Sequence, residues 1–436
     1  MARILMINPP VYDFTAYDLW AKPLALLYLS SILKKQNIQV DFFDYMDRLS
    51  DLVEHTESNE YGCGHYIRLK VPKPKAIDNI KRNYFRFGIP KNIAEKHLKT
   101  LNKPDVIIIG SIMTYWYMGV ESVARSLKKI FPDTPIILGG VYATLCFEHA
   151  KKIKGIDEII IGGFQGLESV LNKYNIHVAI SNNFALFPMP DYSMYKKLEY
   201  IALRTGIGCP FNCSYCAQKI LNNRTHVLKS TEVIKNEIYE LSAYKNIKNI
   251  VFYDDALFYN ANKHIKVLFK SILDDNKNFN FHTPNGLHAK FLDEELAELM
   301  FHVKLINPRF SLETTDAHEQ QYSDHKITNS EFKSAIKILN KAGYDKGEYT
   351  VYLLLGLPNQ NISNIKDSIK FANDLGAKIS FSEYSPIPYT AHWAYVDELF
   401  KDEPLFQNKT YFLSQQKNYH EMLELKQLAK NLNNKL

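Results

Sequence analysis

Residues 206–218 read Gly-Ile-Gly-Cys-Pro-Phe-Asn-Cys-Ser-Tyr-Cys-Ala-Gln and hold three of the five cysteines of this 436-residue chain. These three, Cys209, Cys213 and Cys216, follow a CxxxCxxC spacing, so their thiolates can converge on one inorganic centre. A four-iron cluster normally takes four cysteine ligands. Three close cysteines without a fourth nearby leave one iron open to a small molecule. The stretch therefore predicts an iron–sulfur site with an open position.

The bulk composition is that of an ordinary globular protein, with 46% hydrophobic and 23% charged residues. The length predicts two or three domains. No apolar run approaches the roughly 20 residues of a membrane span, and Met1 leads straight into a strand-like segment without a signal peptide. Two cysteines outside the triad make no disulfide framework. We therefore expect a cytoplasmic protein with no membrane partner.

The net charge of +6 is spread along the chain without an arginine-rich block. Nucleic acid is therefore an unlikely partner. RNA modification would need a basic accessory domain, and the lysine-rich stretch at the C-terminus is too short to form one.

The first 175 residues alternate short apolar runs with helical patterns. This is typical of a doubly wound, Rossmann-like parallel sheet. The expected strands lie at 3–8, 39–43, 106–110, 135–138 and 158–161, with helices at 23–36 and 120–130. A polar, irregular insertion at about 45–104 is expected either as a lid over a ligand crevice or as a surface excursion. Within it, Cys63 is either an exposed hydrogen-donating thiol or incidental.

Glycines and a short turn follow the strands of this sheet, where a flat or anionic ligand can approach the backbone closely. A cofactor crevice is therefore expected at the strand ends, lined by Asn8, Pro9, Gly139, Gly140 and Gly162.

A proline-stiffened linker is expected at 176–198, and a second α/β domain after it. Strands at about 199–205, 249–254, 279–283, 305–313, 347–355 and 378–384 alternate with five helical patterns. This rhythm predicts a partial (β/α)6 TIM-type barrel over 199–395, with its chemistry at the strand carboxyl ends. The cysteine loop follows the first of these strands. Residues 396–436 are expected to form a C-terminal helical cap.

Together, the CxxxCxxC motif and the six-fold repeat resemble the radical S-adenosylmethionine (SAM) superfamily. The resemblance covers about 199–395. It implies a 4Fe-4S cluster whose open iron binds SAM and whose electron cleaves it. It also implies an electron donor such as flavodoxin or ferredoxin, and a small-molecule or peptide substrate that the sequence does not identify.

The resemblance also implies cofactor contacts in the motif and after later strands, namely at Tyr215, Asp254, Asp255, Glu313 and Gly356. The aspartate pair would meet the SAM ammonium or order the substrate, Glu313 would lie near the ribose or amino group, and Gly356 near the adenine. Apart from Tyr215, each also has a structural interpretation as a strand-end or turn residue.

Three further positions are open at this stage. Asn359 and Tyr389 stand where the family usually has glycine, which leaves the geometry of those two turns open. His282 is either an acid/base or cofactor contact or a structural histidine.

The N-terminal domain resembles the cobalamin-binding domain that precedes the barrel in one large class of the superfamily. The matching segments are 8–10, 23–25, 139–144 and 161–163, although the last departs from the usual Gly-acid-Gly-Glu form. Cobalamin is therefore a candidate cofactor, and the alternative is a retained fold without a cofactor.

The leading interpretation is a radical SAM enzyme that transfers a methyl group to an unactivated carbon or phosphorus. Another radical reaction is the second. An alternative from a different class is a non-catalytic nucleotide-binding protein with structural zinc, for which His226 is an isolated candidate fourth ligand.

Overall fold

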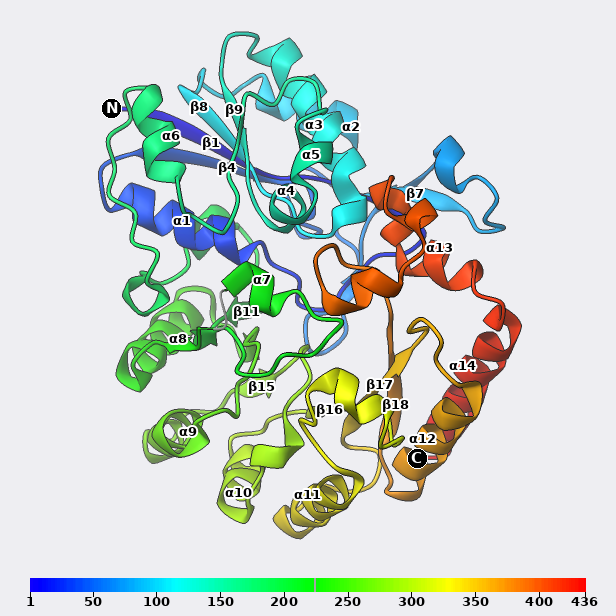
Figure 1. The fold of residues 1–436 in the computed structure, drawn as a ribbon. Coiled ribbons are helices and arrows are strands. Elements are labelled where there is room, and N and C mark those ends of the chain that lie inside the picture. The colour runs from blue at the N-terminus through cyan, green and yellow to red at the C-terminus, as the bar shows by residue number, and fades with distance from the viewer. Residues whose placement is uncertain (223–224) are drawn as a thin grey trace. The chain divides into compact units, whose positions relative to one another are not determined.

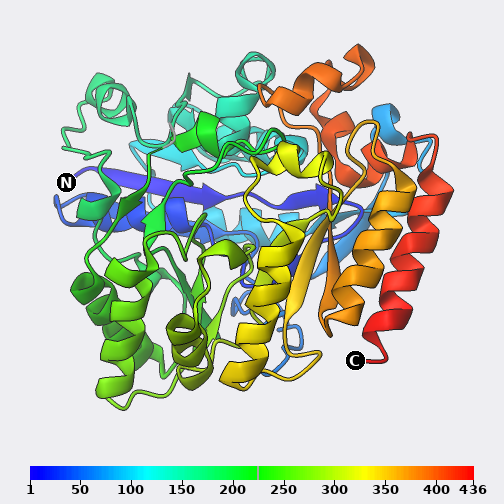
Figure 2. The same ribbon diagram turned by 60° about the horizontal axis from the view of Figure 1, so that its bottom comes forward.

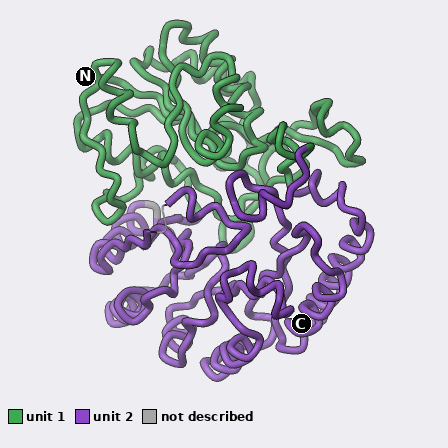
Figure 3. The backbone as a smooth tube through the Cα atoms, in the orientation of Figure 1, with its two compact units in different colours: residues 1–199, 399–408 green, residues 200–398, 409–436 purple. Residues whose placement is uncertain are grey.

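The computed structural model describes residues 1–222 and 225–436 and divides into two compact units (Figure 3). Unit 1 comprises Met1–Glu199 and Leu399–Asn408, and unit 2 comprises Tyr200–Glu398 and Lys409–Leu436. None of the helices in the described part of the chain combines the length and apolar character needed to cross a bilayer.

Unit 1 is built on a five-stranded parallel sheet, as predicted (Figure 1). Its order is β10-β9-β8-β1-β4. The strands are β1 (Arg3–Asn8), β4 (Gln39–Asp44), β8 (Val106–Ile109), β9 (Ile136–Leu138) and β10 (Glu158–Ile159). The chain runs from β1 to β4 on one side and then to β8 on the other. The carboxyl ends of β1 and β8 therefore flank a topological switch point, where open α/β sheets bind ligands.

Helices on this sheet follow from apolar spacing. They are α1 (Leu24–Lys34), α3 (Tyr117–Ile130), α4 (Val141–Leu145), α5 (Phe147–Ala150) and α6 (Leu167–Lys173). In α3 the buried residues Val120, Val123, Ala124 and Leu127 recur at helical spacing. All four residues of β8 are buried, as expected for a strand covered on both faces.

The insertion at about 45–104 is more regular than the sequence indicates. It forms β5 (Gly64–His65), β6 (Arg68–Val71), β7 (Tyr84–Phe87) and α2 (Lys91–Leu98). All pairings are antiparallel: β7 pairs with β6 and with β2 (Val11–Asp13), and β5 pairs with β3 (Tyr17–Asp18). Strands β2 and β3 directly follow β1 in sequence. Their partners are therefore distant in sequence, which hides the pairing from local patterns.

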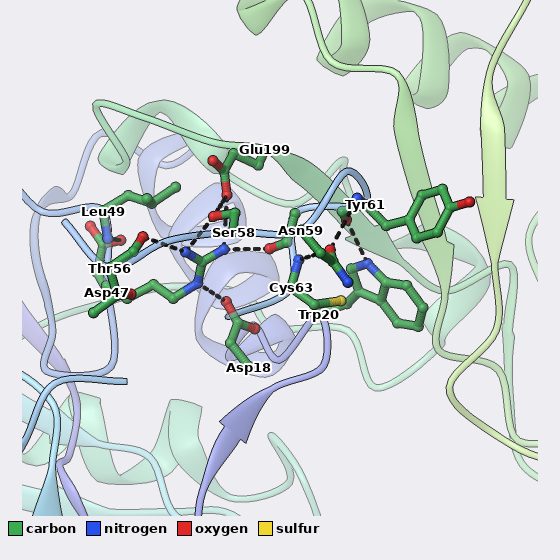
Figure 4. A network of polar contacts seen from close by, with 12 residues as sticks. Asp18, Trp20, Asp47, Leu49, Thr56, Ser58, Asn59, Tyr61, Cys63 and Glu199 are labelled. Atoms are coloured by element: carbon green, nitrogen blue, oxygen red, sulfur yellow. Dashed lines mark hydrogen bonds and ion pairs between the residues drawn. The ribbon is translucent and has the colours of Figure 1, made fainter. Parts of the chain in front are cut away.

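A buried arginine organises part of this insertion (Figure 4). The Arg48 guanidinium donates to the Asp18 carboxylate at 2.9 Å, to Ser58 Oγ at 2.6 Å and to Glu199 at 2.8 Å. Beside this network, Cys63 is only 2% exposed. The interpretation of Cys63 as an exposed hydrogen-donating thiol is therefore wrong.

Residues 176–198, which the sequence predicts as a linker, belong to unit 1. They contain short 3-10 turns at Phe184–Leu186 and Tyr192–Met194. Asp191 pairs with Lys34 at 2.7 Å and accepts a hydrogen bond from Ser30, both on α1. The segment is thus held to a helix by a partly buried ion pair.

Unit 2 contains all six predicted strands in chain order (Figures 1 and 2). They are β11 (Tyr200–Leu203), β14 (Asn249–Phe252), β15 (Asn280–His282), β16 (Arg309–Glu313), β17 (Thr350–Leu355) and β18 (Lys378–Glu383). They pair in parallel as β11-β14-β15 and β16-β17-β18, and single bridges at Phe281–Leu305 and Leu287–Phe310 join the two halves. This is the predicted partial barrel.

The helices of unit 2 lie outside these strands (Figure 1). They are α8 (Thr231–Lys245), α9 (Ile265–Asp274), α10 (Glu294–His302), α11 (Asn329–Ala342), α12 (Ile362–Asp374) and α14 (Tyr419–Asn433). Shorter elements are β12 (Gly206–Ile207), β13 (Val227–Leu228), α7 (Gln218–Asn222) and α13 (Lys409–Ser414). The expected C-terminal cap is split between the units, because Leu399–Asn408 returns to unit 1.

Candidate active site

The cysteine loop starts from a short hairpin in which β12 pairs with β13. Gly208 lies at its end with φ +89°, and a Cβ there would come within 1.7 Å of the Thr225 carbonyl oxygen. Only glycine fits this position without moving the hairpin backbone. The backbone conformation that positions Cys209 therefore depends on Gly208.

Cys209, Cys213 and Cys216 are half-buried, unbridged thiols on this loop. Burial raises the pKa of Cys209 to about 11 and that of Cys213 to about 12. A cationic centre would offset this penalty, because metals bind the thiolate form. Within the described residues, no three Cys, His, Asp or Glu side chains are grouped to hold one ion. In a four-iron cluster the ligating thiolates bind different irons.

A second loop, residues 322–326, is hydrogen-bonded along the cysteine loop. Ser214 N donates to the Tyr322 carbonyl at 2.7 Å, and Asn212 N donates to the Asp324 carboxylate at 2.9 Å. The Cys213 thiol lies 3.5 Å from the Ser323 carbonyl oxygen. The two loops thus form one assembly, although about 110 residues separate them.

Asp254 and Asp255, at the end of β14, hold the backbone of the cysteine loop. Asp254 Oδ1 accepts hydrogen bonds from Gly206 N at 2.7 Å and from Thr205 Oγ1 at 2.5 Å. Asp255 accepts from Gly208 N at 2.9 Å and from Gln218 at 2.7 Å. Burial raises the pKa of Asp254 to about 6. Both carboxylates therefore position the cysteine loop, and their contact with SAM stays a prediction.

Glu313 ends β16 at a bulge, with the left-handed φ of +69°. Its carboxylate accepts a hydrogen bond from Lys326 Nζ at 2.6 Å, and both side chains are under a tenth exposed. Burial alone would lower the pKa of Lys326, but Glu313 and the thiols of Cys213 and Cys209 raise it. A charged lysine thus faces the cysteines.

Several buried polar groups around the motif have no hydrogen-bond partner among the described residues. They include the Tyr215 hydroxyl, which lies beside Cys213, the Tyr384 hydroxyl and His392 Nδ1. The ring of His392 lies 6.3 Å from that of Tyr215 and 6.2 Å from that of Tyr384. Buried polar groups are normally satisfied, so these atoms indicate a polar ligand or water here.

The two turns that replace a usual glycine keep the left-handed geometry. Asn359 has φ +62° and Tyr389 has φ +67°. Gly356, at the end of β17, has φ +90°, and its N–H donates to Gln360 Oε1 at 2.8 Å. His282 lies 3.1 Å from Asn249 Oδ1 and is buried, which fits its structural interpretation.

The carboxyl edge of the sheet in unit 1 offers space and apolar surface. A Cβ on Gly139 or Gly163 would meet no atom within 4 Å, and Gly162 is nearly as open. Ile112, Met113 and Ile161 are each 43–51% exposed, and they follow β8 and β10. This surface fits a large flat ligand.

Other predicted residues of this edge have structural partners. Gly140, with φ +103°, packs against the backbone of Ser111. Asn8 Nδ2 donates to Asp44 at 2.6 Å, and Pro9 is buried. Asn8 and Pro9 therefore shape the end of β1, and a contact of either residue with a cofactor stays a prediction.

Residues 203–372 match the Radical SAM superfamily. This segment of the chain is a radical SAM domain. An uncharacterized methyltransferase of Pyrococcus horikoshii is 22% identical over 325 residues, which cover 67% of this chain and 69% of that protein.

Two solved structures share the fold. The radical SAM methyltransferase TsrM from Kitasatospora setae, with tryptophan substrate and a SAM analogue bound, superposes with a TM-score of 0.67 at 14% identity. That match covers 90% of this chain and 75% of TsrM. The cobalamin-dependent radical SAM enzyme OxsB, with aqua-cobalamin and SAM bound, gives 0.60 at 14% identity over 99% of this chain and 62% of OxsB. The shared fold therefore includes the sheet of unit 1.

The radical SAM domain implies a 4Fe-4S cluster and SAM, and the residues present fit both. Three thiols on one loop supply a soft donor set. Lys326 supplies a cation for a carboxylate, and the orphaned polar atoms near Tyr215 supply partners for a polar ligand.

Two side chains of this radical SAM domain were missed by sequence reasoning, Lys326 and His288. Lys326 follows two residues in the left-handed conformation, Asp324 and His325, which no pattern of apolar residues reveals. The available signal was a single lysine in a polar loop before α11, too common to single out.

Proposed function

We propose that this enzyme binds a 4Fe-4S cluster and SAM in unit 2 and cobalamin in unit 1, and that it transfers a methyl group to an unactivated carbon or phosphorus of its substrate. The cysteine triad on the loop fixed by Gly208, Asp254 and Asp255 carries the proposal. The methyltransferase names of one relative and of TsrM support the reaction type, and the cobalamin bound to OxsB supports the second cofactor.

When bound, the cluster supplies one electron for reductive cleavage of SAM, and cobalamin supplies a methyl carrier. The chain's own residues then have defined roles. Cys209, Cys213 and Cys216 bind three irons. Lys326 offers its charge to the SAM carboxylate, with Glu313 keeping that charge in place at 2.6 Å.

Water exclusion follows from the barrel strands. The side chains of Val351, Leu353 and Leu355 on β17 are fully buried, so the apolar core extends along this strand up to the turn at Gly356. A reactive radical requires such an environment, because water and solvent protons open side reactions.

The proposed binding of cobalamin rests on one surface of unit 1. The open space over Gly139 and Gly163 and the exposed Ile112, Met113 and Ile161 fit the face and edge of a corrin ring. We further infer an electron donor of the flavodoxin or ferredoxin type, because reductive cleavage of SAM consumes one electron, and a reducing, cytoplasmic setting, because iron–sulfur chemistry requires one.

The proposal is tested by anaerobic reconstitution of the purified chain. We expect about four irons per chain, consumption of SAM with release of 5′-deoxyadenosine or S-adenosylhomocysteine, and retention of added cobalamin after gel filtration. Cys213→Ala should lose the iron and the SAM products but keep cobalamin.

Cys146→Ala is the matched control, because Cys146 lies in unit 1 and should leave iron unchanged. Wild-type protein without iron, or iron that survives Cys213→Ala, would contradict the cluster assignment. Iron and SAM turnover without cobalamin retention would leave the radical chemistry intact and remove the methyl-carrier assignment.

A further inference from the structure

His288 is held in place by its backbone. The preceding residue, Leu287, forms a bridge to β16, in which Leu287 N donates to the Arg309 carbonyl at 2.6 Å and Ser311 N donates to the Leu287 carbonyl at 3.0 Å. These two hydrogen bonds fix the backbone next to His288, from which its side chain projects. Its side chain is buried, with 6% of the residue exposed.

The imidazole is also held by the cysteine loop itself. It stacks on Phe211, with ring centroids 4.9 Å apart and 12° between the planes, and Phe211 lies between Cys209 and Cys213. Phe291 lies on the same cluster of rings, 6.3 Å from His288. The ring has little freedom to turn away from the loop.

This arrangement directs one ring nitrogen at a cluster ligand. His288 Nε2 lies 4.0 Å from Cys209 Sγ, a contact distance for the large sulfur atom. The other nitrogen, Nδ1, is buried and has no hydrogen-bond partner among the described residues. The Cys209 sulfur is therefore the polar partner that the structure offers to this imidazole.

We propose that His288 donates an N–H···S hydrogen bond from Nε2 to the Cys209 thiolate and thereby raises the reduction potential of the cluster. A thiolate bound to iron accepts hydrogen bonds only, so the imidazole proton resides on Nε2. The inference rests on the cluster assignment of the proposed function.

The physical reason is electrostatic. Reduction adds one negative charge to the cluster, and a fixed N–H dipole at a ligating sulfur stabilises that charge. The Cys213 thiol, in contrast, faces the Ser323 carbonyl oxygen, which cannot donate. At Cys209, therefore, the His288 N–H dipole stabilises the reduced state of the cluster. His288 is a positioning and tuning residue here and does not touch the substrate.

The test is the midpoint potential of the reconstituted cluster, followed by electron paramagnetic resonance during an anaerobic redox titration. His288→Phe keeps the stacking ring and removes the donor, so the potential should become more negative. In His288→Gln the amide nitrogen occupies the place of Nε2 and keeps the donor, so the potential should stay near that of the wild type. In His288→Asn the amide nitrogen occupies the place of Nδ1, and the potential should fall as in the Phe variant.

His282→Phe is the matched control. His282 is another buried histidine, the last residue of β15, but it lies against Asn249 and not against a cysteine, so the cluster potential of this variant should equal that of the wild type. Equal potentials for the Gln and Asn variants at full iron content would overturn the inference and leave the proposed function standing. A wild-type chain that binds no iron would overturn both. If His288→Phe fails to fold, the Gln and Asn pair decides.

Discussion

At the scale of single residues, the site depends on one buried ion pair. Lys326 Nζ lies 2.6 Å from Glu313 Oε1, and the side chains are 7% and 8% exposed. Two desolvated charges stabilise a fold only as a pair, since either one alone is an uncompensated charge in a medium of low polarity. Lys326 is therefore structural in the free enzyme as well as a candidate cofactor contact.

Lys326→Met should lower the free energy of unfolding of the cluster-free chain by about 3–5 kcal/mol, because it leaves Glu313 buried and unpaired. The double variant Lys326→Met, Glu313→Gln should recover most of that loss. Lys341→Met is the control, because Lys341 and Glu294 form a pair at 2.8 Å in which both side chains are about 60% exposed. Its cost should stay below about 1 kcal/mol. Chemical unfolding measures all three.

The pH dependence of this pair has a definite sign. The folded chain raises the pKa of Lys326 above its ordinary value of 10.5, so the pair's contribution is complete below that pH and is lost as the pH rises through the folded value. The difference in stability between wild type and Lys326→Met should therefore be constant from neutral pH to about pH 9. A difference that shrinks over that range would contradict a charged, paired lysine.

At the scale of elements, two turns after barrel strands adopt a conformation that favours glycine without having one. Asn359 and Tyr389 both have a left-handed φ. Asparagine tolerates this region, whereas for tyrosine it costs roughly 1–2 kcal/mol. Tyr389 is 66% exposed, so little packing offsets that cost. The turn after β18 therefore keeps its shape against the preference of its own residue.

Tyr389→Gly should raise the free energy of unfolding by up to about 1 kcal/mol, since the relief of strain exceeds the entropy that glycine adds to the unfolded chain. Asn359→Gly, at an equally left-handed position, should change stability by less. Thermal or chemical unfolding of the cluster-free variants measures both. A Tyr389→Gly variant less stable than wild type would show that the tyrosine ring makes a contact stronger than the strain.

The same elements show what the sequence could and could not predict. Strands such as β1, β8 and β17 are short, mainly apolar runs, and the regular alternation of such runs with helical patterns was enough to find the others. The candidate cluster site could also be predicted from a local pattern, because its three cysteines lie within eight residues of sequence.

What the sequence could not reveal depends on contacts between distant segments. Lys326 reaches the cysteines because residues 322–324 hydrogen-bond to the cysteine loop, and His288 reaches Cys209 through a bridge to β16. Strands β7 and β5 of the insertion pair with β2 and β3, which lie before α1 in sequence. The assignment of Asp254 to the cofactor rested on family resemblance, and the backbone donors around it become visible only in three dimensions.

At the scale of the whole molecule, the chain completes unit 1 with a segment from near its C-terminus. Within Leu399–Asn408, Asn408 Nδ2 donates to Asp13 Oδ1 at 2.9 Å, and both residues are at most 5% exposed. Gln407 Oε1 lies 4.0 Å from the Cys146 thiol. Burial raises the pKa of Tyr117, and the nearby Glu403 carboxylate raises it further. Unit 1 is therefore formed by two separate stretches of the chain. Its stability depends on Leu399–Asn408, which follows the barrel strands in sequence.

Asn408→Ala should loosen this segment. Loss of a buried hydrogen bond to a carboxylate costs about 1.5–3 kcal/mol, so local opening of Leu399–Asn408 should become roughly ten- to hundredfold more frequent. Burial raises the pKa of Cys146 to about 12, so its alkylation requires that opening. The rate of alkylation at Cys146, read by mass spectrometry, should rise by that factor. Cys63, which is 2% exposed and distant in sequence, serves as the internal reference.

The control is Asn431→Ala on α14, where the hydrogen bond that the side chain accepts from Gln427 is exposed. Its alkylation rate at Cys146 should match the wild type. If Asn408→Ala accelerates Cys63 as much as Cys146, the whole of unit 1 opens together and the segment is an integral part of its core. If neither cysteine responds, the Asn408–Asp13 hydrogen bond does not hold the segment. Selective acceleration at Cys146 would show that the C-terminal return closes unit 1 as a separately opening strap.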